Sequence, residues 1–264
     1  MEWPDKSVET PEYLLKRVRA GAGCGSGPAY KPWTTFRRRG GHGSDRLFTC
    51  TITGRQIDLP SVAHDAYYFL LERRPTTISI EETFPLLDVA ESLSACAAFG
   101  VSHPTRDRHP EPITLDFLIR QRKTDGSTLL QGRTIAKPPV DASSASLFHV
   151  MQSICSKHGV SWKLVDPAPL NSTLASSLRF ARTWALERFQ PGPDDEVDLA
   201  RSFMSVHRPS MTLKDVIDKV ATKVPCTSTE ALQRFRYAAW RGCIRVDFTH
   251  ELRLDKPVHL MAVR

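Results

Sequence analysis

Hydrophobic positions in the N-terminal part of the chain predict alternating helices and strands. After Ser61, a residue suited to N-capping, apolar side chains recur at helical spacing, which predicts a helix over 61–73. Residues 76–86 favour a strand, and strict alternation over 113–121 predicts another. Asp125-Gly126 then predicts a two-residue turn into a third strand over 128–137. The last two strands therefore form a predicted hairpin.

The pattern after this hairpin predicts one more helix and one more strand. Pro138 and Pro139 end the hairpin, and Gly159 is suited to stop the helix that follows. That helix is indicated by apolar residues at amphipathic spacing, namely Leu147, Val150, Met151 and Ile154. A short strand follows over 160–165. This order of elements predicts an α/β domain over 1–168.

The remaining residues, 169–264, predict a second domain of a different kind. Helices are expected over about 175–189, 212–221 and 227–242, and the last begins with a Thr227–Glu230 capping box. Alternation over 244–248 predicts a strand, with 257–263 as its partner. Helix, turn, helix and β-hairpin is the order of a winged-helix domain.

Composition and charge narrow the function classes. The chain has 264 residues, 41% of them hydrophobic and 25% charged, and a formal net charge of +7. A basic balance favours an anionic partner such as nucleic acid. The six cysteines include no CxxC pair, and no HExxH, GxSxG or Walker motif is present. Without a CxxC pair we expect no zinc ribbon. No apolar run is long enough to span a bilayer, so we expect a soluble, intracellular protein.

Two basic segments are candidate DNA contacts. The stretch from Tyr13 to Ser44 has no acidic residue, and its glycines alternate from Gly21 to Gly27, which resembles a phosphate-cradling loop. A flexible loop beside a solvated basic face is the alternative. The third C-terminal helix is also basic and favours either DNA contact or protein docking. The predicted DNA-binding residues are Lys31, Arg37, Arg38, Arg39, Arg234 and Arg241.

The predicted hairpin brings a carboxylate and a lysine together. With a two-residue turn, Asp116 lies opposite Ile135 and has Lys137 as its diagonal neighbour, about 7 to 8 Å away. A carboxylate that holds Mg²⁺ beside a lysine that orients water or stabilises charge is suited to phosphodiester cleavage. A surface ion pair is the alternative interpretation of the same spacing.

Several blocks, in order over residues 15–166, resemble the TnsA family, the endonuclease subunits of heteromeric, target-selecting transposases. The C-terminal likeness is weaker and consists of the winged-helix pattern with Gly242 and Val246-Asp247. The blocks that carry the resemblance are the Gly-rich stretch from Gly21, Tyr30-x-Pro32-Trp33, Thr53-Gly54-Arg55, the helix after Ser61, Phe84-Pro85-Leu86-Leu87, His103-Pro104, Asp116-Phe117 and Ala136-Lys137-Pro138.

This resemblance implies a restriction-endonuclease-like mixed sheet flanked by helices, followed by the winged-helix domain. It implies a bacterial, cytoplasmic, DNA-associated protein that cuts the 5′ strands of double-stranded DNA at transposon ends and uses Mg²⁺ or Mn²⁺. It further implies two partners: a TnsB-like transposase that cuts the 3′ strands, and a TnsC-like ATPase regulator.

The family site consists of a helical Glu, a strand Asp, and a Gln or Glu two residues before a Lys. The resemblance places Asp116 and Lys137 in the last elements, but His64 at the Glu position and Ile135 at the Gln or Glu position. Asp65 is an alternative metal ligand next to His64. Two hypotheses follow: a metal-dependent nuclease that uses Asp116, Lys137, His64 and Asp65, or a non-cutting scaffold of the same complex. A stand-alone repair or restriction nuclease is a third.

Overall fold

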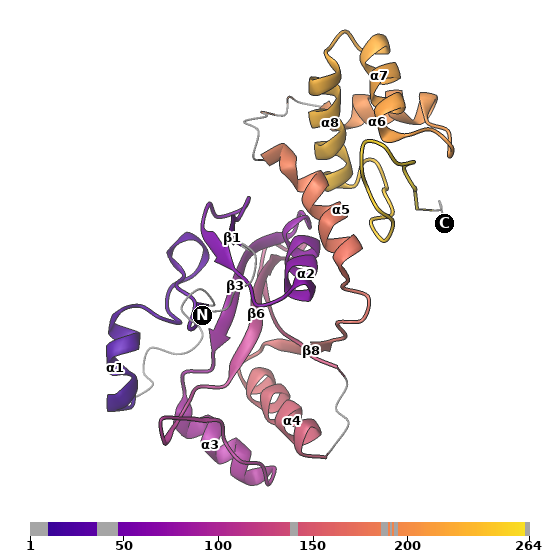
Figure 1. The fold of residues 1–264 in the computed structure, drawn as a ribbon. Helices are drawn as coiled ribbons and strands as arrows, with labels where there is room; N and C mark the ends of the chain where they lie inside the picture. Colours follow the sequence, from indigo (N-terminus) through magenta and orange to yellow (C-terminus); the bar gives the residue numbers. More distant parts are fainter. Residues whose placement is uncertain are drawn as a thin grey trace. The chain divides into compact units, whose positions relative to one another are not determined.

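The computed structural model describes residues 10–35, 47–137, 142–185, 190, 192 and 195–261. These residues form two compact units, Met1–Ser61 with Thr76–Pro169, and Val62–Pro75 with Leu170–Arg264 (Figure 1). The second unit therefore includes a helix from the N-terminal part of the sequence, whereas the sequence assigned all of 1–168 to one domain. The domain boundary itself stays a prediction.

The first unit is built on a mixed four-stranded sheet. Its strands are β3 (Thr77–Pro85), β6 (Thr114–Arg122), β7 (Thr128–Ile135) and β8 (Ser161–Val165), in the order β3-β6-β7-β8. The first three pair antiparallel, and β7 pairs parallel with β8. A parallel pair needs a crossover connection, and α4 (Ala142–Lys157) provides it.

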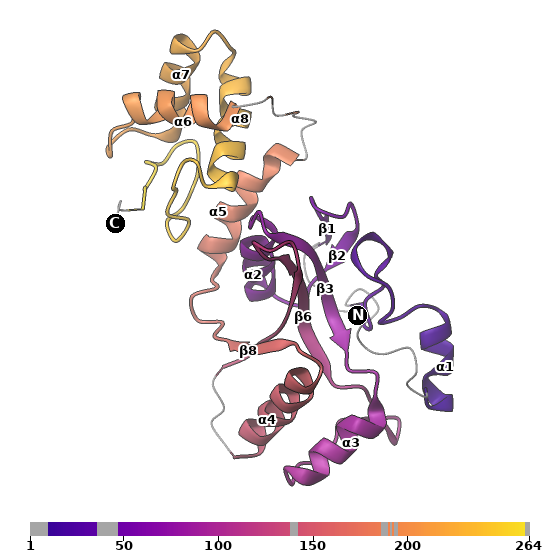
Figure 2. The ribbon, with the colours of Figure 1, turned by 180° about the vertical axis from the view of Figure 1, so that it is seen from behind.

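Two helices share a hydrophobic core with this sheet. They are α3 (Val89–Ala98), whose N-cap Asp88 accepts a hydrogen bond from Glu91 N–H, and α4 (Figures 1 and 2). Because their apolar residues repeat at helical spacing, each helix turns one stripe of side chains towards the strands. The cluster contains Phe84, Leu86, Cys96, Leu115, Leu118, Val150, Met151, Ile154, Cys155 and Val160.

Several short elements of the first unit have no clear sequence pattern, and the sequence did not predict them. They are α1 (Glu12–Arg19), a 3-10 turn η1 (Gly27–Ala29), the pair β1 (Leu47–Thr49) and β2 (Gln56–Asp58), and the pair β4 (Thr105–Arg106) and β5 (His109–Pro110). Strands of two or three residues are too short for a period-two pattern to be recognised.

The β6–β7 hairpin forms, but its predicted turn and register are wrong. The backbone N–H of Lys123 donates to Ser127 O and that of Gly126 to Lys123 O, which closes a three-residue loop with Gly126 at φ 81°. Phe117 consequently pairs with Arg133, one residue away from the predicted register. β7 ends at Ile135, so Lys137 lies beyond the strand.

The second unit is helical. The predicted capping box is confirmed, since Thr227 and Glu230 bond reciprocally, and Gly242 ends the last helix in the left-handed region. Residues 186–189 of the predicted helix over 175–189 lie outside the described residues. The elements of the second unit are α2 (Val62–Glu72), α5 (Ser172–Arg182), η3 (Thr183–Ala185), α6 (Asp195–Val206), α7 (Leu213–Lys223) and α8 (Ser228–Arg241).

The predicted C-terminal strands are reduced to short contacts. Val246 and Leu260 form an isolated antiparallel bridge, and Asp247 N–H donates to His259 O. The helix α6 (Asp195–Val206) was not predicted from the sequence. In the part of the chain with described structure, no helix combines the length and hydrophobicity that crossing a membrane requires.

Candidate functional site

Asp116 lies where β6 and β7 separate. Paired residues of the two strands end at Phe117 and Arg133, although β7 continues to Ile135. The half-buried Asp116 carboxylate accepts a 2.6 Å hydrogen bond at Oδ2 from the backbone N–H of Ile135. The side chain of Asp116 thus satisfies a peptide group at the point where the ladder ends.

The strand next to Asp116 is strained. On β3, Glu82 pairs with Phe117 and Phe84 with Leu115, which places Thr83 across from Asp116. Thr83 has φ 46°, a rare conformation for a β-branched residue, and is fixed by a hydrogen bond from its Oγ1 to Thr34 O. Strained backbone of this kind clusters at functional sites, which supports a role for this part of the sheet.

Next to this strand lies a buried ion pair that the sequence did not predict. Arg55 donates from both terminal nitrogens to the two carboxylate oxygens of Glu82, which is 1% exposed. Burial raises the pKa of the Glu82 carboxyl, and the hydrogen bonds and charge of Arg55 oppose that shift. The bidentate pair stabilises the edge strand β3 from the β1–β2 side.

The helix α2 carries the other two candidate ligands, His64 and Asp65. Asp65 is 2% exposed, and its Oδ2 accepts a hydrogen bond of 2.9 Å from Arg179 of α5. At the end of the helix, Glu72 accepts two bonds from Arg182 Nε and Nη2, at 2.6 and 3.1 Å. His64 is half-buried. The acidic residues of α2 therefore neutralise the arginines of α5 within the second unit.

The end of α2 is also attached to α8. Arg73 donates hydrogen bonds to the carbonyls of Trp240 and Ala239, at 3.1 and 3.0 Å. These carbonyls belong to the last turn of α8, where a cation is favoured by the helix dipole. α2 is thus an integral helix of the second unit.

The residues do not fit the divalent metal site that the resemblance implies. Mg²⁺ prefers hard oxygen ligands in near-octahedral geometry. Ile135 supplies no side-chain oxygen, and the Asp65 carboxylate is already paired with Arg179. Within the described ranges, no three His, Cys, Asp or Glu side chains form a group able to hold a metal ion. Asp116 is thus left without a second oxygen ligand from these positions, and Lys137 is exposed beyond the end of β7.

The Gly-rich segment is bound to the sheet rather than open to an anion. The amide of Gly27 donates to the Glu81 carboxylate at 3.0 Å, and that of Gly23 donates to Lys31 O. Gly23 has φ 72°, and a Cβ there would overlap Pro85. These amides are used inside the protein, so this segment does not form the phosphate cradle suggested by its spacing.

The predicted DNA-contact residues have different surroundings. Lys31 is exposed and donates from Nζ to Ala20 O at 3.2 Å. On α8, Arg234 is half-buried and Arg241 is exposed. Arg37, Arg38 and Arg39 lie outside the described residues. Their contact with DNA stays a prediction.

The mixed α/β sheet flanked by helices is compatible with a nuclease-like fold. Over 106 residues the chain is 28% identical to the transposition protein TnsA of transposon Tn7 from Escherichia coli. The aligned stretch covers 40% of this chain and 38% of that relative, so less than half of the relative's length is matched. No model of a known protein family matches the chain.

Proposed function

We propose that this protein is a TnsA-like subunit of a DNA transposition complex. The observation that carries the proposal is the 28% identity to the Tn7 transposition protein over 106 residues. The mixed sheet supports it, because the resemblance implied a sheet of this kind. In this role the protein acts on double-stranded DNA at transposon ends, with a TnsB-like transposase and a TnsC-like ATPase regulator.

Its role in the complex is assembly rather than cutting. Two positions that should provide oxygen ligands carry His64 and Ile135, and the neighbouring Asp65 neutralises Arg179. Without those ligands a divalent ion has too few hard donors to stay bound. Cleavage of the 5′ strands is the competing function, and the presence of Asp116 and Lys137 favours it.

The second unit is the proposed docking unit of this subunit. α7 and α8 are joined by a short turn and followed by the Val246–Leu260 bridge, which is the order expected of a winged helix. The exposed Arg241 at the end of α8 offers a cation to DNA or to an acidic face of the regulator.

A transposition assay in cells tests the proposed function. A donor element with its transposase and regulator is supplied with or without this protein, and insertions are counted. We expect insertions to fall to background without the protein and to be restored equally by the wild type and by Asp116→Ala. Unchanged insertion without the protein would contradict a role in transposition. Restoration by the wild type alone would support cutting instead.

A further inference from the structure

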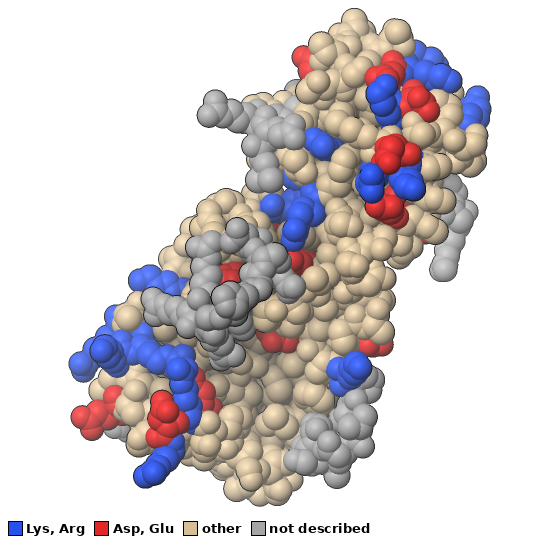
Figure 3. All heavy atoms as spheres, in the orientation of Figure 1, with Lys and Arg blue, Asp and Glu red and all other residues tan. Residues whose placement is uncertain are grey.

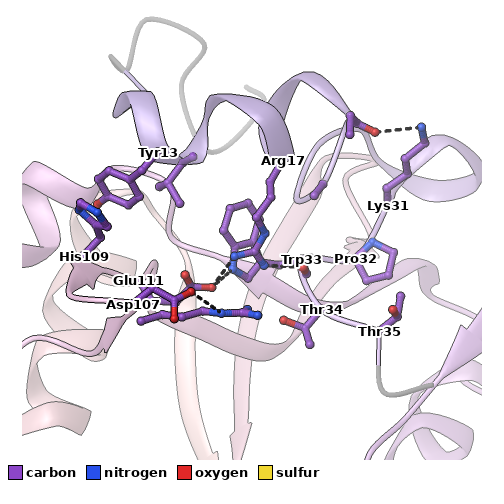
Figure 4. Close-up of a pocket in the computed structure, with 14 residues that line it drawn as sticks. Tyr13, Arg17, Lys31, Pro32, Trp33, Thr34, Thr35, Asp107, His109 and Glu111 are labelled. Atoms are coloured by element: carbon purple, nitrogen blue, oxygen red, sulfur yellow. Dashed lines mark hydrogen bonds and ion pairs between the residues drawn. The ribbon is translucent and has the colours of Figure 1, made fainter. Parts of the chain in front are cut away.

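A cavity of about 800 Å³ lies in the first unit, and Asp116 is not among the residues that line it (Figure 4). Three segments form its wall: the helix α1, residues 31–35, and the β4–β5 hairpin with Glu111. The proposed function assigns no ligand to these segments, although Lys31 is one of the predicted DNA contacts. The volume is within the range of cavities that take small organic ligands.

One wall of the cavity is a fixed aromatic platform. Tyr13 stacks on His109 with ring centroids 4.6 Å apart and an angle of 19° between the rings. The Tyr13 hydroxyl donates to Pro110 O at 2.7 Å, and the side chain is still 37% exposed. The ring is therefore held in place before any ligand binds, which reduces the entropy cost of stacking on it.

The floor of the cavity has an organised cation. Arg17 lies over the ring of Trp33 at 3.6 Å from its centroid, donates to Trp33 O, and pairs with Glu111 at 2.6 Å. Glu111 also accepts a bond from Trp33 Nε1 at 2.8 Å. The negative charge of Glu111 is thus compensated within the cavity.

Further cations surround the opening. Lys31 and Arg106 are exposed on the cavity wall, with Asp107 as the acidic neighbour of Arg106 at 3.9 Å. Lys16 and Arg19 are exposed on α1 outside the lining, and Figure 3 shows Lys and Arg side chains, with some Asp and Glu among them, over the part of the unit where α1 lies. An anionic ligand is favoured at this opening.

The β4–β5 turn at the rim is strained. Asp107 and Arg108 both have positive φ, 50° and 69°, although neither is glycine. Two positive φ values in a two-residue turn are those of a type I′ turn, for which Asn or Gly is usual. This turn contains the lining residue Asp107 and joins the two strands that carry Arg106 and His109, so its strained backbone fixes the rim of the cavity.

We infer that this cavity binds one unpaired nucleotide of a single-stranded DNA segment. The base stacks on Tyr13, since every base has a face that stacks on an aromatic ring. Its phosphate faces the cations at the rim, which favour a negative charge. A cut in one strand creates a strand end, and terminal nucleotides unpair at a lower cost than nucleotides inside an uncut duplex. The inference therefore rests on the proposed function and names the DNA form that the first unit recognises.

Fluorescence anisotropy with labelled oligonucleotides of about 12 nucleotides tests this inference, since single-strand sites have about this length. The full-length protein is titrated with a single strand and with the matching duplex, and deoxynucleoside monophosphate is added as a competitor. We expect Tyr13→Ala to weaken single-strand binding at least about fivefold, the lower limit for the loss of one stacked base, and Tyr13→Phe to restore it. Duplex binding should change by less than about twofold, because phosphate contacts dominate it.

Phe99→Ala is the matched control. Phe99 is 43% exposed and stacks on His149 with centroids 6.2 Å apart, but it belongs to the end of α3. Its loss should leave single-strand binding unchanged. Competition by the monophosphate would show that a free nucleotide is sufficient for binding. Its failure to compete would show that the chain of phosphates is required. Either result supports the cavity as the site when Tyr13→Ala also weakens single-strand binding.

Equal single-strand affinity of wild type and Tyr13→Ala would overturn the inference and would favour a protein segment as the ligand of the cavity. An equal loss for strand and duplex would also overturn it, because stacking on a base would then not be the contact. Thermal melting of each variant identifies a loss caused by unfolding. Arg106→Ala then serves as the second variant, since Arg106 is an exposed cation of the cavity lining and its loss should also weaken single-strand binding. Transposition that still depends on the protein would leave the proposed function intact in either case.

Discussion

Replacing Glu72 with Gln is expected to destabilise the protein by about 3–5 kcal/mol, because it leaves Arg182 charged and buried without its acidic partner. The two side chains are 4% and 2% exposed and share two hydrogen bonds of 2.6 and 3.1 Å. Urea unfolding followed by tryptophan fluorescence measures the loss as a lower unfolding midpoint.

Two variants make this result interpretable. Asp198→Asn removes a surface ion pair with Arg201, in which the side chains are 68% and 76% exposed, and should change the free energy of unfolding by less than about 1 kcal/mol. The double replacement of Glu72 and Arg182 with Leu should recover much of the loss, since an apolar pair needs no charge compensation. A loss below about 1 kcal/mol for Glu72→Gln would show that the pair does not fix α2 to α5.

Replacing Arg55 with Met is expected to make the stability depend more strongly on pH. Burial already raises the pKa of Glu82, and the loss of Arg55 removes the interactions that oppose this shift. The folded protein then binds the Glu82 proton more tightly than the unfolded chain, whose Glu pKa is about 4.3, so stability falls as pH rises above that value. Near neutral pH we expect a loss of about 3–5 kcal/mol relative to wild type.

Urea unfolding at about pH 4.5, 6 and 8 measures this dependence across the Glu82 titration. The difference between wild type and Arg55→Met should increase with pH. Adding Glu82→Gln to Arg55→Met removes the titrating group, so the double variant should show a smaller change with pH than the single variant. The same difference at all three pH values would mean that Glu82 does not titrate as the buried partner of Arg55.

The long periodic elements were predictable because their signals are local. The helix after Ser61, the helix that ends before Gly159 and the helix that begins at Thr227 all form within a few residues of their predicted bounds. Each combines an apolar stripe with a cap or a stop residue, and these signals do not depend on the rest of the fold.

The hairpin register was not predictable from its turn residues. Asp125-Gly126 fits a two-residue turn and equally a three-residue loop with Gly126 in the left-handed conformation. The sequence does not distinguish them, and a shift of one residue changes which side chain lies across from Asp116. The predicted proximity of Asp116 and Lys137 depended on the wrong choice.

The ion pairs between the acidic residues of α2 and the arginines of α5 join distant parts of the sequence. The sequence carried one signal that Arg182 is buried. Arg182 lies four residues after Leu178 and next to Ala181, on the apolar stripe of α5. A charged residue on such a stripe needs a buried partner. Its partner Glu72 is 110 residues away, so no local pattern connects the two residues.

Strand-specific cleavage of transposon-end DNA tests the central claim, that this protein supports transposition without cutting. The protein, as wild type or Asp116→Ala, is combined with the partner transposase and regulator in Mg²⁺ and, separately, in Mn²⁺, and each DNA strand is labelled. We expect the same 3′-strand cuts with both proteins and no 5′-strand cuts. Cuts on the 5′ strand that vanish with Asp116→Ala would contradict the claim and establish a working nuclease.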